Sequence, residues 1–246
     1  DETVVIDINT VDNGTENGTQ TATTTILDDD ATPTVTLSVV STTINESGSP
    51  TTTLVRATLS AESNLSVTVT LTKTGTALEG SDYSLPGTIV IPALNISASV
   101  TLAATNDSAA EEDETVVINI TGVTNGSENG TQTATTTIVS EDVPDAPTGL
   151  AITYDIKKFD FNWTASSNGA TSYDLYEALN GIDFTKIKAV TGTTTALEIA
   201  VHIHPWSLAK YKVKGCVKVT QCGTLFSADV NTANAMLQAT GYLKAT

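Results

Sequence analysis

Short stretches of alternating apolar and hydroxyl residues run through the first 142 residues of the chain. Residues 66–72 read SVTVTLT and place Val67, Val69 and Leu71 on one face, and residues 97–102 keep the same period of two. Thr and Val favour a pleated strand because branching at Cβ restricts their side chains in a helix. The pattern therefore predicts half-buried β-strands with one apolar face.

After residue 30, strands are predicted at residues 35–40, 51–59, 66–72, 87–91, 97–103, 114–121 and 131–139. Turn-forming sequences separate several of them, namely Gly48-Ser49-Pro50, Gly80-Ser81-Asp82, Asn125-Gly126 and Asn129-Gly130. About seven short strands at this spacing are typical of an antiparallel β-sandwich.

A repeat organises this half of the chain. Residues 1–30 (DETVVIDINTVDNGTENGTQTATTTILDDD) and residues 113–142 (DETVVINITGVTNGSENGTQTATTTIVSED) are identical at 22 of 30 positions without a gap, which gives a period of 112. Such a period indicates tandem copies of a whole domain. We therefore predict one complete copy at residues 31–142 and, at residues 1–30, the C-terminal strands of a preceding copy.

Charge and aromatic content change near residue 143. Residues 1–142 hold 20 Asp and Glu against Arg56 and Lys73, whereas residues 143–246 hold eight acids against nine Lys. Tyr83 is the one aromatic residue before this boundary, and the other eleven follow it. Two domain types are therefore predicted. The acidic half argues for cations and against nucleic acid, whose phosphates need Lys and Arg.

No apolar run approaches the length of a membrane-spanning helix, so no membrane span is predicted. No basic-then-apolar leader opens the chain. Because residue 1 falls inside a repeat, we expect an excerpt or a processed product, in which a missing leader says nothing about secretion.

Four segments of the complete copy carry a resemblance to a known family: residues 44–48 (INESG), 75–83 (GTALEGSDY), 106–114 (NDSAAEEDE) and 141–142 (ED). In this order and spacing they resemble the Calx-β domain, known from sodium–calcium exchangers, an integrin and many bacterial surface proteins. The resemblance covers residues 31–142 and the remnant at 1–30. It implies an immunoglobulin-like sandwich that binds calcium at one end.

Carried over residue by residue, the resemblance implies calcium ligands at Glu46, Asp82, Asp107, Glu111, Glu114 and Asp142, with Glu141 as a further ligand. The residues favour the same cation independently. Crowded carboxylates repel one another and take up protons unless a cation lies among them. Calcium accepts about six to eight oxygen ligands in flexible geometry, magnesium is stricter, and zinc prefers His or Cys, which residues 1–142 lack.

The chain departs from the family at two positions. Asn106 stands in place of an acid, and Ser140 begins what is often a run of three aspartates. Both changes reduce negative charge, so a second calcium is expected to be weak or missing. The preceding copy keeps the run as Asp28, Asp29 and Asp30, which are further predicted ligands. The alternative interpretation of all these acids is a solvated, solubilising rim.

The second half begins with a Pro-punctuated linker at residues 143–147. Residues 148–230 resemble a fibronectin type III domain through PTGL at 147–150, FDFNW at 159–163, SYDLY at 172–176 and LAKYKV at 208–213. The resemblance implies a second sandwich with Trp163 as the core indole and Tyr211 as the corner tyrosine. Residues 231–246 are a C-terminal extension to which the sequence assigns no role.

Two pairs of residues in this half raise separate questions of chemistry. Cys216 and Cys222 are either a small hairpin disulfide, formed in an oxidising compartment, or two buried thiols. His202 and His204 lack an evident third metal ligand, which favours an ordinary loop or strand end.

No Ser/His/Asp, Cys/His or phosphate-loop pattern occurs, so the chain is predicted not to be an enzyme. The expected fold class is all-β, with tandem antiparallel β-sandwiches. The expected function is a calcium-stabilised structural or adhesive segment of a surface protein or filament, located extracellularly or at the cell surface. Two alternatives stay open: a non-catalytic accessory module of a secreted hydrolase, and a calcium-sensing regulatory module.

Residues 1–30 allow two interpretations, because two strands cannot bury their own apolar face. They are either a fragment, disordered or packed opportunistically, or they complete a sandwich in trans in a neighbouring molecule. The second interpretation predicts filaments or swapped oligomers. The expected partners are thus calcium and neighbouring repeats of the same protein.

Overall fold

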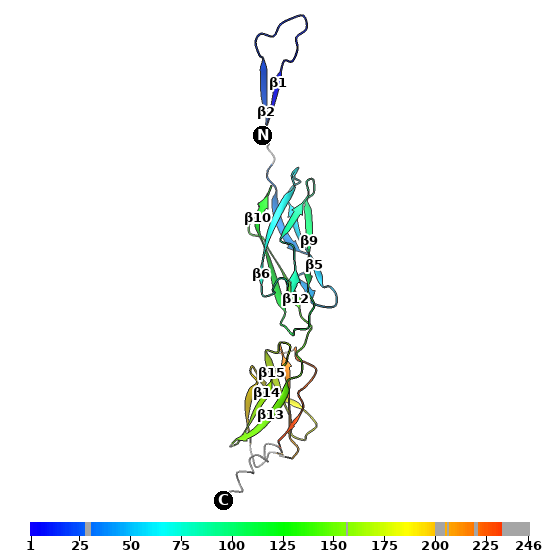
Figure 1. The fold of residues 1–246 in the computed structure, drawn as a ribbon, viewed down its shortest axis with the longest axis vertical. Helices are drawn as coiled ribbons and strands as arrows, with labels where there is room; N and C mark the ends of the chain where they lie inside the picture. The colour runs from blue at the N-terminus through cyan, green and yellow to red at the C-terminus, as the bar shows by residue number, and fades with distance from the viewer. Residues whose placement is uncertain (28–30, 156, 200–204, 206, 219–220, 233–246) are drawn as a thin grey trace.

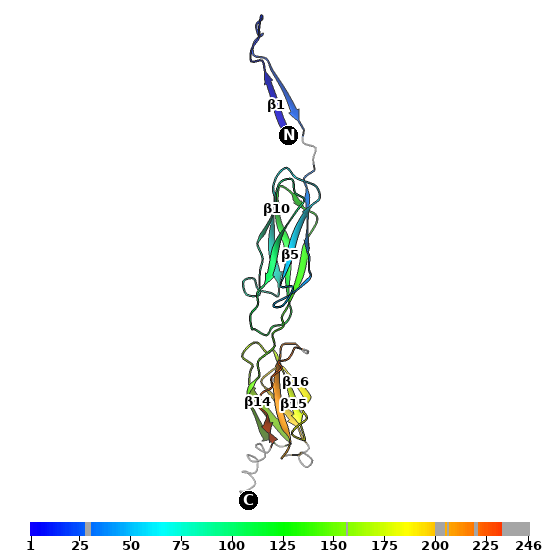
Figure 2. The same cartoon turned by 90° about the vertical axis from the view of Figure 1, so that its right-hand side faces the viewer.

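The structure is a computed structural model that describes residues 1–27, 31–155, 157–199, 205, 207–218 and 221–232. Its named secondary-structure elements, β1 to β19, are all strands, which confirms the all-β class. A two-stranded hairpin and two β-sandwiches follow one another along the long axis (Figures 1 and 2). The predicted ligands at 28–30 and both histidines lie outside the described residues. Within that part of the chain, no helix is long and apolar enough to cross a membrane.

Two five-stranded sheets form the first sandwich. One sheet has the order β4 (Thr43–Asn45), β12 (Thr133–Val139), β10 (Glu114–Thr124), β6 (Val67–Gly75) and β8 (Thr88–Ile91). The other has the order β11 (Ser127–Glu128), β3 (Thr34–Val39), β5 (Thr52–Leu59), β9 (Ser97–Ala104) and β7 (Tyr83–Ser84).

The ladders of this sandwich are antiparallel except at two short edges, where β4 pairs with β12 and β11 pairs with β3 in parallel. The β4 edge arises because the chain crosses from one sheet to the other after β3. The sequence pattern predicts neither β4, β7 nor β11, since strands of two or three residues are too short to show a period of two.

Branched aliphatic side chains from both sheets fill the space between them. Val67, Val69 and Leu71 are at most 5% exposed, so the inward face that their alternation predicts is confirmed. Tyr83 also belongs to this core. Strand β10 continues past the predicted end at residue 121, because a β-bulge between Ile120 and Gly122 absorbs one extra residue without ending the ladder.

The second sandwich has a three-stranded and a four-stranded sheet. The first has the order β13 (Thr148–Asp155), β14 (Lys158–Thr164) and β17 (Thr194–Glu198). The second has the order β16 (Thr185–Val190), β15 (Ser172–Ala178), β18 (Lys210–Cys216) and β19 (Val230–Asn231).

Aromatic side chains make up much of the second core. The Trp163 ring meets Tyr173 edge-on at a centroid distance of 5.5 Å, and Phe161 lies 4.9 Å from Tyr211. The buried Tyr211 hydroxyl donates to Glu177 Oε1 at 2.6 Å. Cys216 and Cys222 form a disulfide, which selects the first of the two predicted alternatives.

The hairpin at the N-terminal end repeats the β10–β12 pair of the first sandwich. Its strands are β1 (Glu2–Asp7) and β2 (Thr21–Ile26). Each residue pair across β1 and β2 recurs, 112 residues later, across β10 and β12. The side-chain amide of Gln20 donates to Asn17 O at 2.6 Å, and that of Gln132 donates to Asn129 O at 2.5 Å. Residues 2–7 and 21–26 thus pair as a hairpin without the other strands of a sandwich around them.

The two copies of this hairpin differ in how far their side chains are buried. Ile118 of β10 is 0% exposed, whereas its counterpart Ile6 of β1 is 62% exposed. All residues of β1 and β2 are exposed, so their apolar face has no cover among the described residues. The same sequence thus forms the same local structure in two different environments.

We expect Ile118→Ala to lower the free energy of unfolding of the first sandwich by about 2–5 kcal/mol, because it leaves a cavity in the core. The matched Ile6→Ala substitution is expected to change it by less than about 0.5 kcal/mol. Chemical denaturation followed by fluorescence of a label in the first sandwich measures both values. Equal losses in the two variants would contradict the environments described above.

Candidate metal centre

Six predicted ligands converge at the end of the first sandwich that faces the second. They come from separate parts of the chain: the ends of β4 and β12, the loops before β7 and after β9, and the start of β10. They fall into two groups of three, each with carboxylate oxygens within 4.8 Å of one another: Glu46, Asp107 and Asp142, and Asp82, Glu111 and Glu114. We call this end the acidic pole.

A glycine-dependent contact brings Asp82 beside Glu114. Gly75, at φ +122°, lies so close to β10 that a Cβ there would be 2.0 Å from Thr115 O. The backbone N–H groups of Thr76 and Ala77 both donate to that oxygen, at 3.0 and 3.1 Å. The segment between β6 and β7 is therefore fixed on the start of β10, where the second group of carboxylates forms.

Asp82 is also held by its own loop. Its Oδ2 accepts from Leu78 N at 2.5 Å, and its backbone oxygen accepts from Thr105 N at 2.9 Å. The adjacent Tyr83 is buried in the core and anchors this turn. The loops before β7 and after β9 are thus tied together directly beneath the acidic pole.

Glu46 forms the buried floor of the first group. It is 5% exposed, its N–H donates to Val139 O at 3.0 Å, and its Oε1 accepts from Asp107 N at 3.2 Å. Burial raises the pKa of Glu46 above its ordinary range, against the lowering effect of the Asp107 N–H, and the charges of Asp107 and Asp142 raise it further.

Repulsion extends across both groups. Burial, followed by the charges of carboxylates in the two groups, raises the pKa of Glu111. Burial, the hydrogen bond with Asp82 and neighbouring negative charge raise the pKa of Glu114 to about 7. Burial and the charges of Glu141 and Asp107 raise the pKa of Asp142. None of the six carboxylates takes part in an ion pair with a Lys or Arg of the described residues.

Two buried side-chain oxygens in the segment after β12 have no hydrogen-bond partner, Asp142 Oδ2 and Ser140 Oγ. Asp142 Oδ2 is buried and unsatisfied, which is costly unless a ligand contacts it. A hard cation such as calcium fits this site, because all of its ligand atoms are carboxylate oxygens and irregular loops set their positions. The buried carboxylate oxygen without a hydrogen-bond partner also fits such an ion.

Three other acids of the predicted region lie outside the two groups. Glu141 Oε2 accepts from Ser47 N at 3.3 Å, so in the structure this predicted ligand contacts the loop that follows β4. Glu112 is exposed, and Asp113 forms an ion pair with Lys218 of the second sandwich at 2.5 Å. The loop has no regular alternation, so its sequence does not show that Glu111 and Glu114 belong to a group while Glu112 and Asp113 do not.

Asp174, Cys216 and Cys222 also lie close enough together for a metal, but their two sulfur atoms are joined in a disulfide and offer no thiolate ligand.

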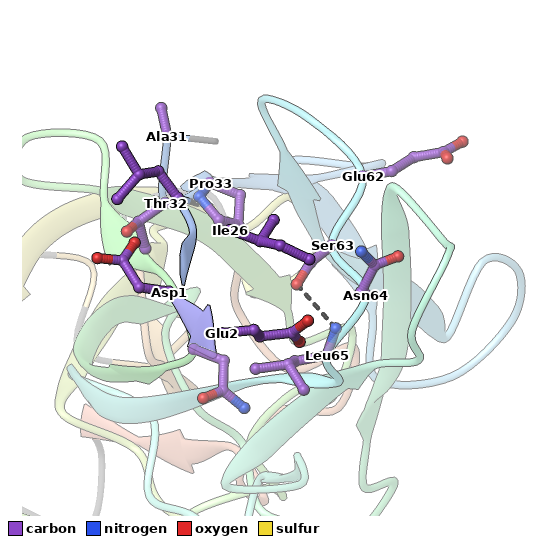
Figure 3. Close-up of a pocket in the computed structure, with 12 residues that line it drawn as sticks. Asp1, Glu2, Ile26, Ala31, Thr32, Pro33, Glu62, Ser63, Asn64 and Leu65 are labelled. Carbon is purple, nitrogen blue, oxygen red and sulfur yellow. Dashed lines mark hydrogen bonds between the residues drawn. The ribbon is translucent and has the colours of Figure 1, made fainter. Parts of the chain in front are cut away.

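A separate open pocket lies at the opposite end of the first sandwich. It is lined by hairpin residues and by the β5–β6 loop; Figure 3 shows Asp1 and Glu2 on one side and Glu62, Ser63 and Asn64 on another.

The fold and site define the chain as a tandem of immunoglobulin-like β-sandwiches with a carboxylate-rich pole. No protein-family model matches its sequence, and no curated protein matches it. Solved structures similar to it include the apo form of the Calx CBD1 domain (19% identity, 46% of this chain and 100% of that chain, TM-score 0.39). Others are CBD12 from CALX1.2 (13%, 76% and 82%, TM-score 0.38) and a two-domain fibronectin type III segment of chicken tenascin (17%, 80% and 95%, TM-score 0.29). Similarity at this level assigns neither a family nor a ligand.

The metal-free protein is expected to lose stability as the pH rises from about 4.5 to about 7. Glu114 keeps its proton up to a pKa of about 7 in the folded state, against an ordinary value of 4.5, so the folded state binds more protons in this window. Thermal unfolding in EDTA at pH 5 and pH 7.5 measures the effect. Glu114→Gln is expected to reduce the difference; a profile that Glu114→Gln leaves unchanged would contradict this assignment.

Proposed function

We propose that the acidic pole binds calcium and that the ion stabilises a structural segment of an extracellular or cell-surface protein. The observation that carries the proposal is that six carboxylates lie in two groups of three at one end of the sandwich. One of their buried oxygens, Asp142 Oδ2, has no hydrogen-bond partner. The closed disulfide supports an oxidising compartment. In this proposal the six carboxylates are the ligands, and the predicted ligands at 28–30 serve the preceding copy.

Calcium would join parts of the chain that the core does not hold together. Its ligands come from five places at the pole, and its charge offsets the repulsion that raises their pKa values. A cation that binds the folded chain alone stabilises it by mass action. At about 10 mM calcium and a Kd of about 0.1 mM, the gain is roughly 2.7 kcal/mol per ion.

A calcium-sensing module is the second candidate function, and affinity separates the two. A sensor needs a Kd near about 1 µM, whereas a structural module needs only about 0.1–1 mM. An accessory module of a secreted hydrolase would show the same affinity as a structural segment, and its enzyme would lie elsewhere in the same polypeptide.

Glu111→Gln is expected to weaken calcium binding by about tenfold or more, because affinity at such sites depends on the number of charged ligands. Glu112→Gln is the matched control: the same change, one residue away, on an exposed side chain outside both groups. Because Glu112 is exposed and belongs to neither group, solvent and salt screen its charge, and the substitution is expected to change the affinity by less than about twofold. Isothermal titration calorimetry measures both, with magnesium as a competitor.

Loss of affinity to the same extent in the two variants would mean that general charge, and not ligation at the pole, attracts the ion. A wild-type chain that takes up no calcium at millimolar concentration would reject the proposed function.

For residues 1–30, we propose that the exposed face of the hairpin is covered by the remaining strands of a repeat of the same type. The matching register of β10 and β12 supports this, since those strands are covered by β6 and by the facing sheet. In an exchange in trans, the β1–β2 hairpin of one molecule would replace β10 and β12 in the sandwich of another. Each β1–β2 hairpin buried in this way would expose one pair of strands β10 and β12. Such a swap therefore gains no burial, and the partner must be a repeat that lacks its own last two strands.

A chain extended by a second copy of residues 31–112, joined directly before Asp1, supplies that partner. We expect β1 and β2 to become protected from amide hydrogen exchange in this chain. We also expect Ile6→Ala to destabilise the added repeat by about 2–5 kcal/mol, as a core substitution does. Hairpin amides that exchange as fast as in the 246-residue chain would reject the proposal.

A further inference from the structure

Two loops of the second sandwich contact the backbone of the acidic pole. One loop joins β14 to β15 and contains Asn168 and Gly169. The other follows β18, is closed by the Cys216–Cys222 disulfide, and contains Gln221. Figures 1 and 2 show the two sandwiches meeting end to end at this junction.

Asn168 holds the loop that carries Asp107 and Glu111. Its Nδ2 donates to Ser108 O at 3.2 Å, and its backbone oxygen accepts from Ala110 N at 2.8 Å. Both contacts fall between the two predicted ligands in sequence. The same loop is therefore shaped at its centre by a residue from the other sandwich.

Asn168 also holds the linker between the sandwiches. Its Nδ2 also donates to Val143 O at 3.3 Å, and its Oδ1 accepts from Asp145 N at 2.7 Å. Gly169 makes this approach sterically feasible, because at φ +102° a Cβ there would be 2.5 Å from Ala110 O.

Gln221 holds the segment that carries Asp142. Its Nε2 donates to Ser140 O at 3.0 Å and to Asp142 O at 2.6 Å, and so fixes the backbone on either side of Glu141. Two backbone bonds shape the Gln221 loop itself: Val217 N donates to Gln221 O at 3.0 Å, and Gln221 N donates to Lys218 O at 3.2 Å.

We propose that Asn168 and Gln221 are positioning residues of the calcium site, so that the site is shared between the two sandwiches. The proposal rests on the calcium function above. Each residue fixes the backbone next to a carboxylate of the first group, Asp107 or Asp142, and neither offers a ligand itself. Both side chains are neutral, so their removal leaves the charge of the pole unchanged.

Shared positioning makes the coupling reciprocal. If the junction raises calcium affinity, calcium must stabilise the junction by the same factor. Calcium is therefore expected to protect amides of the second sandwich, which contains none of the predicted ligands. It is also expected to restrict the angle between the sandwiches.

The test uses the full chain with Asn168→Ala, Gln221→Ala and the double variant. Asn162→Ala is the matched control, an exposed residue within β14 and outside the two loops of the junction. Each single variant is expected to weaken calcium binding by about three- to tenfold, because hydrogen bonds of this kind contribute factors of that order. The double variant is expected to lose more than either, and Asn162→Ala less than about twofold.

A second readout separates positioning from a merely structural role. Hydrogen exchange is measured at the Ala110 amide and at Val217 in the second sandwich, with and without calcium. Calcium is expected to slow exchange at both in the wild type, and to lose its effect at Val217 in the double variant while the second sandwich stays folded by circular dichroism.

The outcomes distinguish the two proposals. A wild-type chain without calcium binding overturns both. Wild-type binding that Asn168→Ala and Gln221→Ala leave unchanged overturns the shared site alone. A loss of affinity equally large in Asn162→Ala also overturns it, because that residue does not touch the pole.

Discussion

Mutual repulsion among carboxylates held at one end of a β-sandwich is the constraint on which the rest of the molecule depends. Backbone N–H groups hold three of the six carboxylates in place: Leu78 N donates to Asp82, Asp107 N donates to Glu46 and Ala109 N donates to Asp107. The folded state must therefore hold protons or a cation at the pole. In the proposed function, a divalent cation offsets this repulsion at a pH at which the carboxylates carry no protons.

The core supplies the stability that allows this arrangement. Strands rich in Val and Ile fill the first sandwich, and the repulsive carboxylates lie beyond this core, on loops and at the start of β10. Two features connect core and pole: Tyr83 places a buried ring next to Asp82, and Gly75 lets β6 approach β10 beside Glu114. Both belong to the segment GTALEGSDY, which explains why it reads as a motif although it contributes a single carboxylate to the pole.

Period-two alternation was sufficient to predict the long strands, including the inward face of β6. It failed for β4 and β7, because two or three residues carry no period, and for the end of β10, because a bulge at Gly122 has no sequence signature of its own here. At the pole, the sequence predicts the acidic loop, but it does not predict that Asp113 forms an ion pair with Lys218. The Asn168 and Gln221 contacts depend on how two domains meet, and nothing local to either residue predicts such a contact.

The duplicated hairpin separates what local sequence determines from what a partner determines. The register, the positive φ angles in the turn and the Gln-to-Asn hydrogen bond recur at the matching positions of the first sandwich. The 21 identities that residues 1–27 share with residues 113–139 are therefore enough to specify them. Burial is not specified, because it depends on strands outside the hairpin. The pole follows the same logic: its carboxylates belong to the first sandwich, whereas part of the support for its loops comes from Asn168 and Gln221 of the next domain. Local sequence therefore places the acids on their loops, and the neighbouring domain contributes to how those loops are held.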